Sequence, residues 1–327
     1  MSKITETDYQ EYSKLIEEGH SQRSACLILG LNRSTIQRYI KSVLESEEIK
    51  ETVLGVQNQN DYTDWQSKPK PELDVKSVQS KQTILVIADT QAKSEESLEY
   101  LLWIGHYIAE KQPDIIVHIG DHYDFPSLSS YDKGKSSAEG KRLVKDIEAG
   151  NIGFEYLNMA MQKHKKYNPR KIFCLGNHEH RLDRYIDDNP ELIGTLGTDF
   201  LPFDKYGWEV HPFLKPVEVN GIFFVHYLAN PFSGKPYGGN AMNILKTVGR
   251  SFVVGHKQCL DIAIRPTIDG KQQIGIVNGA CYDHNESYKG YQGNNHFRGL
   301  TVLHEAQDGF AVPCFVSLSY MKDNYYA

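Results

Sequence analysis

The stretch KIFCLGNHEH, residues 171–180, joins a short apolar run to a cluster of polar side chains. The run has the length and composition of a buried strand. Strands often stop at Gly-Asn for ordinary turn reasons, but a plain turn needs neither His178 nor Glu179 behind it. Whether this segment is a turn or a site therefore depends on how the other strands of the chain end.

Around this stretch, short apolar runs alternate with amphipathic helical patterns. The runs lie at 83–88, 114–119 and 171–175, and the helical patterns lie over about 95–111 and near 138–164. This alternation predicts parallel strands joined by crossover helices. After about residue 207 the pattern becomes rich in strands, and the Asn220-Gly221 pair between two apolar runs indicates a hairpin.

Five of the apolar runs end in carboxylate, amide or imidazole side chains. In chain order the endings are Asp89-Thr90-Gln91, Gly120-Asp121-His122-Tyr123-Asp124, Gly176-Asn177-His178-Glu179, His226 and Gly255-His256-Lys257-Gln258. In open parallel sheets, functional groups gather at the carboxyl ends of the strands. Carboxylates and imidazoles that converge there need a counter-charge, which a divalent cation supplies. Any one ending could be an independent turn, but the ordered set predicts a metal site.

In order and spacing, the five endings resemble the motifs of the calcineurin-like metallophosphoesterase superfamily. The family pattern is D-x-H, GDxxD, GNH[DE], a lone His and GHxH, and the resemblance covers residues 83 to about 320. It implies an α/β fold in which a two-sheet β-sandwich is flanked by helices. It also implies metal-dependent hydrolysis of a phosphoester by a metal-activated water.

The resemblance further implies a role for each motif residue. The implied ligands of two divalent metal ions are Asp89, Gln91, Asp121, Asn177, His226, His256 and Gln258, with Asp121 bridging the ions. The implied catalytic residues are His178, Asp121 and Asn177: His178 stays off the metal and assists the leaving oxygen, and Asn177 also meets charge that builds on the phosphate. Asp124 and Glu179 are implied to orient imidazoles.

The chain departs from the family pattern at two positions of the same ion. Gln91 stands where D-x-H has its His, and Gln258 stands at the last His of GHxH, as in a group of phage-encoded relatives that the chain also resembles. A Gln carbonyl is a harder donor than a His nitrogen, which favours Mn²⁺, or Mg²⁺ or another hard divalent ion, over Zn²⁺ and weakens binding. Two alternatives stay open: a two-metal enzyme with one labile ion, and a single-metal or impaired enzyme.

Further side chains near the motifs are candidates for substrate binding. They are His122, Arg181 and Arg298. The basic loop 127–142 and the Tyr-, Asn- and Gly-rich stretch 282–300 could each form a pocket wall or be a plain surface loop.

The N-terminal part of the chain has a different character. We divide the sequence into a small all-α helix-turn-helix domain at 1–48, a polar linker at 49–82 and the phosphoesterase domain at 83–327. Residues 6–44 predict three short helices with Gly30 as the turn before the third, an arrangement that resembles the modules of recombinases and phage regulators. The side chains expected to contact DNA are Arg33, Ser34, Thr35, Gln37, Arg38 and Lys41. A bundle used for docking or oligomerisation is the alternative.

Composition limits the function classes. The formal net charge of -6 excludes a polycation that coats nucleic acid, so any DNA contact must come from a local patch. The 5 Cys residues contain no CxxC pair, which favours reduced thiols and a cytoplasmic location, in the host cytoplasm if the chain is phage-encoded. The polar N-terminus and the lack of a long apolar run predict no membrane association.

The first functional hypothesis is a DNA-directed nuclease, because a candidate DNA reader accompanies a phosphoesterase domain. The alternatives are a phosphomonoesterase acting on protein or small phosphates, with a docking N-domain, and a DNA-binding regulatory protein with an impaired metal site. The oligomeric state is left open, with a homo-oligomer as one option.

Overall fold

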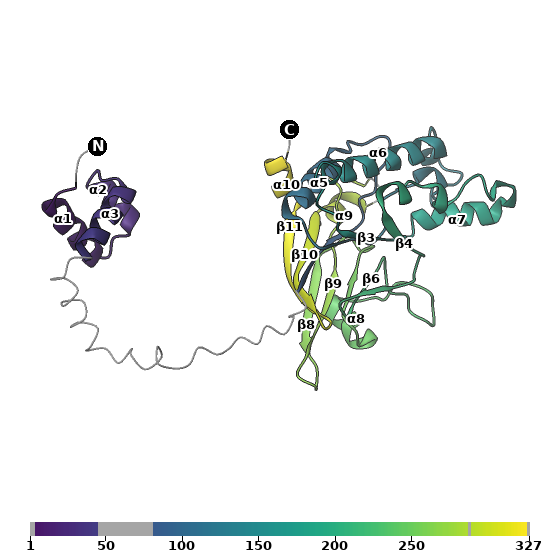
Figure 1. The fold of residues 1–327 in the computed structure, drawn as a ribbon. Helices are drawn as coiled ribbons and strands as arrows, with labels where there is room; N and C mark the ends of the chain where they lie inside the picture. The colour runs from purple at the N-terminus through teal and green to yellow at the C-terminus, as the bar shows by residue number, and fades with distance from the viewer. Residues whose placement is uncertain (1–3, 45–80, 287–288, 326–327) are drawn as a thin grey trace. The chain divides into compact units, whose positions relative to one another are not determined.

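The computed structural model describes residues 4–44, 81–286 and 289–325 (Figure 1). Contacts within the chain divide it into two compact units, Met1–Lys76 and Ser77–Ala327. Of the linker predicted at 49–82, only residues 81 and 82 are among those described, and Gln82 already belongs to the first strand.

The N-terminal unit contains three helices, as predicted. They are α1 (Glu6–Glu17), α2 (Gln22–Ile28) and α3 (Arg33–Leu44). The side chains of Thr5 and Ser21 accept backbone N–H groups at the starts of α1 and α2, which supplies the caps that helix N-termini need. Gly30 takes a left-handed φ of 64° in the turn between α2 and α3. Buried Tyr12, Ala25, Cys26 and Ile36 form the small core of this unit.

The larger unit contains two β-sheets, the first with six strands in the order β11-β10-β1-β2-β3-β4. These strands are β1 (Gln82–Ile87), β2 (Ile115–His118), β3 (Arg170–Cys174), β4 (Trp208–His211), β10 (Gly299–Gln307) and β11 (Phe310–Ser317). Strands β1 to β4 are parallel, and β10 and β11 extend the sheet antiparallel beyond β1. The parallel strands predicted from the first three apolar runs are therefore confirmed.

The second sheet has five strands in the order β5-β6-β7-β9-β8. They are β5 (Val217–Val219), β6 (Ile222–Val225), β7 (Phe252–Val254), β8 (Asp261–Pro266) and β9 (Gln272–Val277). Strands β6, β7 and β9 are parallel, and the outer strands β5 and β8 are antiparallel to their neighbours. Asn220 and Gly221 join β5 to β6 with φ values of 52° and 80°. Two successive left-handed residues are what a tight hairpin turn requires, so the predicted hairpin is confirmed.

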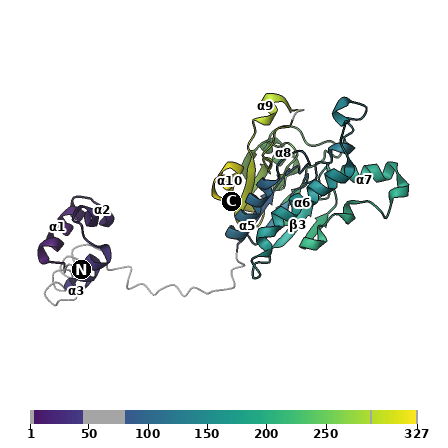
Figure 2. The ribbon, with the colours of Figure 1, turned by 90° about the horizontal axis from the view of Figure 1, so that it is seen from above.

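Six helices of the larger unit are described. They are α5 (Glu99–Lys111), α6 (Leu143–Gln162), α7 (Glu179–Asp188), α8 (Ala241–Val248), α9 (Gly290–Asn294) and α10 (Leu318–Tyr325). Helices α5 and α6 lie side by side (Figure 2). Both begin later than the sequence pattern indicates; before α6, short 3₁₀ turns at Pro126–Leu128 and Ser136–Ala138 occupy the chain.

The larger unit is layered as helices, sheet, sheet and helix (Figure 1). Alternate side chains of β1 face opposite ways, as strand geometry requires: Leu85 and Ile87 join the core under α5, α6 and α10, whereas Ile84 and Val86 join the core between the sheets. A third core lies between the second sheet and α8. The predicted two-sheet sandwich flanked by helices is confirmed. Among the described residues, no helix combines the length and apolarity needed to cross a bilayer.

Candidate active site

The predicted ligands follow parallel strands of both sheets. Asp89, Asp121 and Asn177 follow β1, β2 and β3 of the first sheet, while His226 and His256 follow β6 and β7 of the second. Because the sheets face each other across a shared core, these carboxyl-terminal strand ends lie together. The structure thus brings all five residues to one place.

The backbone at this edge is strained. Five of the seven predicted ligands have left-handed φ angles: Asp89 at 48°, Gln91 at 42°, Asp121 at 55°, His256 at 64° and Gln258 at 55°. A non-glycine residue in this region costs roughly 1–3 kcal/mol and persists only where the surroundings hold it there. Such residues concentrate at functional sites, and the site here is no exception.

Three motif glycines allow the loops to approach one another. A Cβ on Gly176 would lie 2.2 Å from Asp121 Oδ1, and one on Gly255 would lie 2.5 Å from Asp89 Oδ2. A Cβ on Gly120 would lie 2.5 Å from the backbone nitrogen of Gly176. The glycines before Asp121, Asn177 and His256 are therefore required because any side chain would displace the candidate ligands or their loops.

One half of the site has the geometry of a metal centre. Asn177 Oδ1 lies 2.8 Å from His226 Nε2 and 2.7 Å from His256 Nδ1. Asp121 Oδ2 lies 3.2 Å from His226 Nε2. Candidate ligand atoms of Asp121, His226 and His256 all lie within 4.8 Å of one another. An Asp, an Asn and two His form a donor set that suits a divalent ion of the first transition row.

Hydrogen bonding also fixes which nitrogen of His226 faces the site. His226 Nδ1 lies 2.8 Å from the carbonyl oxygen of Ile119, to which only an N–H can donate. His226 Nε2 is then the nitrogen left to bind a cation, an arrangement common among metal-binding imidazoles.

The buried carboxylates in this half of the site favour a positive charge beside them. Burial lowers the pKa of His226, but the carboxylates of Asp121 and Asp89 reverse the shift and raise this pKa to about 9. Burial raises the pKa of Asp89 to about 6. Burial lowers the pKa of His256 to about 4, so this imidazole is neutral and offers a lone pair. The residues fit a divalent cation, which would take over the role of the proton on His226.

The other half of the site is less complete. Gln91 is 1% exposed, and both polar atoms of its amide have no hydrogen-bond partner among the described residues. A buried amide without partners is costly unless a ligand satisfies it, so Gln91 fits a site for a cation beside Asp89. Gln258, in contrast, already uses its amide: Nε2 donates to Asp89 Oδ1 over 3.3 Å, and Oε1 accepts from the Tyr282 hydroxyl over 2.9 Å.

Glu179 does not act as predicted. Its fully buried carboxylate accepts backbone N–H groups rather than orienting an imidazole. The four donors are the backbone nitrogens of Gly176, Asp121, His122 and Tyr123, at 2.8, 2.9, 2.7 and 2.9 Å. Glu179 therefore joins the loop after β3 to the loop after β2. The prediction for its partners is corrected, because the backbone of these loops turns its N–H groups inward.

His178 lies beside the cluster of candidate metal ligands, which Asp121, His226 and His256 form without it. Its Nδ1 is 2.8 Å from Asp124 Oδ1, so Asp124 lies where the sequence places a carboxylate that orients an imidazole. Its Nε2 is 2.9 Å from the Arg181 guanidinium and 3.6 Å from Asp121 Oδ2. Burial lowers the pKa of His178, but the carboxylates of Asp121 and Asp124 more than offset this, and the net shift is upward.

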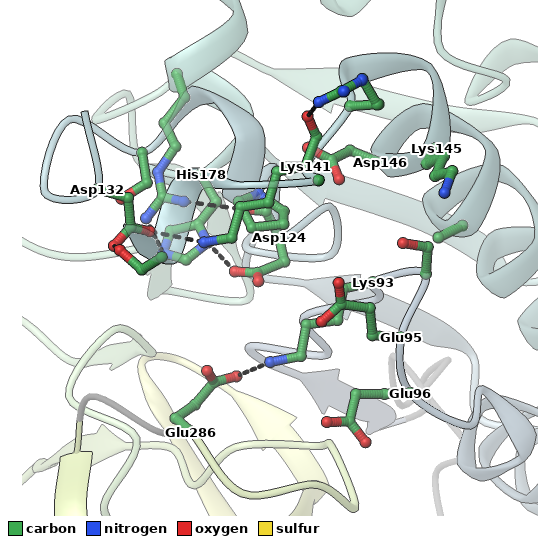
Figure 3. Close-up of a pocket in the computed structure, with 18 of the residues that line it drawn as sticks. Lys93, Glu95, Glu96, Asp124, Asp132, Lys141, Lys145, Asp146, His178 and Glu286 are labelled. Carbon is green, nitrogen blue, oxygen red and sulfur yellow. Dashed lines mark hydrogen bonds and ion pairs between the residues drawn. The ribbon is translucent and has the colours of Figure 1, made fainter. Parts of the chain in front are cut away.

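A cavity of about 1230 Å³ opens beside His178 (Figure 3). Its lining includes Asn177, His178, Arg181 and His256 from the site. Arg181 is held by the backbone oxygens of Asp124 and Phe125 at 2.8 and 3.3 Å, so its guanidinium is fixed at the cavity wall. The segment 127–142 supplies further lining residues: Ser129, Tyr131, Asp132, Lys135, Ser137, Gly140, Lys141 and Arg142. This segment is a pocket wall, one of the two readings left open by the sequence.

His122 is not placed to contact a substrate, which corrects that prediction. Its side chain is 0% exposed. Its Nδ1 lies 2.7 Å from the Thr90 hydroxyl and its Nε2 lies 2.9 Å from the carbonyl oxygen of Gly150 in α6. The side chain after Asp121 turns to the helix side of the sheet, where it joins the loop after β1 to α6.

Arg298 lies on the segment 282–298, outside the lining of the cavity beside His178. Its guanidinium sits over the Tyr282 ring, 5.6 Å from the centroid, and donates to Asn285 Oδ1 over 2.5 Å. Sequence reasoning missed Tyr282 as the partner of Gln258. The sequence shows only that the stretch 282–300 is rich in Tyr and Asn. That composition does not indicate which aromatic ring faces the site.

The sequence matches a known family over most of its length. A model of the family described as calcineurin-like phosphoesterase matches residues 82–303. The gene 54 protein of Mycobacterium phage D29 is 28% identical over 178 residues, which is 53% of this chain and 68% of that protein. The gene 54 protein of Mycobacterium phage L5 is 28% identical over 179 residues, again 53% of this chain and 68% of that protein.

Solved structures show more distant likenesses. A novel archaeal phosphodiesterase is 12% identical with a TM-score of 0.33, covering 72% of this chain and 99% of that chain. The phosphoesterase Yfce from E. coli is 12% identical with a TM-score of 0.32, covering 72% and 99%. The nuclease MPE of Pseudomonas putida is 13% identical with a TM-score of 0.27, covering 71% and 87%. Likenesses at this level carry no conclusion about activity.

Proposed function

The chain belongs to the calcineurin-like phosphoesterase family, and from that premise we propose that it cleaves phosphodiester bonds of DNA with a metal-activated water, using Mn²⁺ in preference to other divalent ions. The observation that carries the chemistry is the convergence of Asp121, Asn177, His226 and His256 beside a cavity that contains His178. Divalent ions bound at such a centre clamp phosphoryl oxygens and make water a nucleophile at neutral pH.

In this proposal, three side chains of the protein bind the phosphoester and stabilise its reacting atoms. The Asn177 amide lines the cavity next to the metal centre, where it can stabilise charge on a phosphoryl oxygen. His178, oriented by Asp124, can hand a proton to the leaving oxygen. The Arg181 guanidinium is fixed against His178 and can hold a second phosphoryl oxygen.

The size of the cavity favours a diester over a small monoester. Pockets for drug-sized ligands span roughly 300–1,000 Å³, and the cavity of about 1230 Å³ exceeds this range. It therefore has room for substrate on the leaving-group side of the phosphorus. Cations on its wall include Lys135 and Lys145, for which no ion pair is found among the described residues.

The N-terminal unit supports DNA as the substrate. On α3, the side chains of Arg33, Ser34, Gln37 and Arg38 are exposed, and their spacing places them on one face. The sequence of α3, RSTIQRYIKSVL, contains no acidic residue. Thr35 is half-buried and sits to the side of this face, and the side chain of Lys41 lies outside the described residues. A basic, amide-bearing helix face of this kind suits phosphates and base edges.

A substrate panel tests the proposal. The full chain is incubated with Mn²⁺ and, in parallel, plasmid DNA, single-stranded DNA and p-nitrophenyl phosphate. We expect DNA cleavage that stops when a chelator is added. Turnover of the monoester without DNA cleavage would replace the proposal by a phosphatase, and DNA binding without any turnover in any metal would replace it by a regulatory protein.

The DNA-binding role of α3 can be tested separately. Arg33→Ala combined with Arg38→Ala is expected to weaken DNA binding ~10-fold or more, and to reduce the salt slope of log K by about 2, because two phosphate contacts are lost. Fluorescence anisotropy at several salt concentrations measures both quantities. Lys14→Ala, which removes an exposed cation from α1 of the same unit, is the matched control. Equal affinity in the control and the double variant would rule α3 out as the reading helix.

A further inference from the structure

A chain of hydrogen bonds links Asp89 to the segment after β9. Gln258 Nε2 donates to Asp89 Oδ1 over 3.3 Å. Gln258 Oε1 accepts from the Tyr282 hydroxyl over 2.9 Å. The Tyr282 oxygen in turn accepts from Lys289 Nζ over 2.9 Å. Gln258 is 6% exposed and Tyr282 is 0% exposed, so water does not compete freely for these bonds.

In this series of hydrogen bonds, each donor points from Lys289 toward Gln258. An ammonium group can only donate, so Lys289 uses the Tyr282 oxygen as an acceptor. The Tyr282 hydroxyl donates its hydrogen to Gln258, which presents its carbonyl oxygen to receive it. The NH₂ end of the Gln258 amide is left facing Asp89. An amide NH₂ has no lone pair to give a cation, whereas the carbonyl oxygen is a good hard donor.

We propose that Tyr282, held by Lys289, turns the Gln258 carbonyl away from the Asp89 half of the site and thereby weakens the binding of the second divalent ion. Gln258 then acts as a hydrogen-bond donor to Asp89 in the resting protein instead of a metal ligand. Tyr282 and Lys289 are positioning residues for this half of the centre. This inference rests on the metal-dependent function proposed above.

The contrast with Gln91 supports this assignment. Gln91 is also buried, but neither polar atom of its amide has a hydrogen-bond partner among the described residues. Its carbonyl can therefore bind a cation without giving up a hydrogen bond to the described residues. Turning the Gln258 carbonyl toward the cation would break the hydrogen bond that it accepts from the Tyr282 hydroxyl. The hydroxyl hydrogen would then need another acceptor. The two glutamines that replace histidines thus differ in their availability as ligands.

Tyr282→Phe is the direct test because it removes the hydroxyl and keeps the buried ring. The Gln258 carbonyl would be left buried without a partner, which favours its rotation toward a cation. We expect the second Mn²⁺ to bind about three- to tenfold more tightly, the range that one net hydrogen bond supplies. The first Mn²⁺ should bind as in the wild type. Electron paramagnetic resonance of metal-stripped protein titrated with Mn²⁺ alone gives both affinities without any measurement of activity.

A matched control and a double variant show whether the effect passes through Gln258. Tyr167→Phe removes a partly buried hydroxyl, which donates to the Pro113 carbonyl over 2.8 Å far from the site in the fold, and should change neither affinity. Adding Gln258→Leu to Tyr282→Phe should abolish the gain, because Leu offers no oxygen. A gain that survives in the double variant would overturn the proposal.

The outcomes separate this inference from the function on which it rests. If the wild type binds one Mn²⁺ tightly and Tyr282→Phe leaves the second affinity unchanged or lower, the positioning role is wrong and the metal-dependent function stands. If the wild type binds no Mn²⁺ at either position, both proposals fail. If the wild type already binds two ions with equal affinity, Gln258 is not withheld and the inference is again wrong.

Discussion

The Asp121→Asn protein is expected to bind no divalent ion tightly and to lose at least ~10³-fold of its phosphoesterase rate, since a bound cation supplies several kcal/mol of transition-state stabilisation. Asp121 stands between the two halves of the site. Its Oδ1 accepts the His178 backbone N–H over 2.9 Å, and its Oδ2 lies 3.2 Å from His226 Nε2. Asparagine keeps the shape and the bond to His178 but replaces a ligating oxygen with NH₂.

Elemental analysis of the purified variant, paired with its rate on the best DNA substrate, measures both effects. Asp269→Asn changes an exposed carboxylate in the β8–β9 turn by the same single atom and should retain metal and rate. Melting temperatures of the two metal-stripped variants separate a lost ligand from a damaged fold. An Asp121→Asn protein that keeps a stoichiometric ion and its activity would show that Asp121 is not a bridging ligand.

The convergence of the five strand-end ligands could be predicted because it follows from topology. Parallel strands place their carboxyl ends at one edge, so an apolar run followed by Asp, Asn or His positions that side chain without any knowledge of packing. Asp121, Asn177 and His226 meet for this reason. The hairpin at Asn220 was predictable on equally local grounds, because its conformation is a property of the dipeptide.

The misassigned residues depend on contacts between segments distant in sequence. His122 directly follows Asp121, yet its side chain lies toward α6, where the Gly150 carbonyl accepts its Nε2–H. Nothing near His122 in the sequence encodes that helix. Glu179 likewise receives backbone donors from a loop that precedes it by 56 to 58 positions. Sequence motifs identify which residues gather at the site, whereas tertiary packing decides which of their atoms face it.

The second large effect is expected from His178→Gln, which should lower the rate on DNA ~10²–10⁴-fold, the usual contribution of a general acid. Its Nδ1 lies 2.8 Å from Asp124, its Nε2 lies 2.9 Å from the Arg181 guanidinium, and both His178 and Arg181 line the cavity. Glutamine can still donate a hydrogen bond but cannot release a proton. Metal content should be unchanged, because the ligand atoms of Asp121, His226 and His256 cluster without His178.

The leaving group distinguishes proton donation from simple positioning. A sugar alkoxide leaves poorly without a proton, whereas p-nitrophenolate is stable as an anion. The His178→Gln protein should therefore lose much less rate on a p-nitrophenyl diester than on DNA. His180→Gln, in the first turn of α7 two residues after His178, is the matched control, because that imidazole stacks on Phe213 at 4.8 Å and pairs with Asp183 instead. Equal losses on both substrates would make His178 a positioning residue, and loss of metal would make it a ligand.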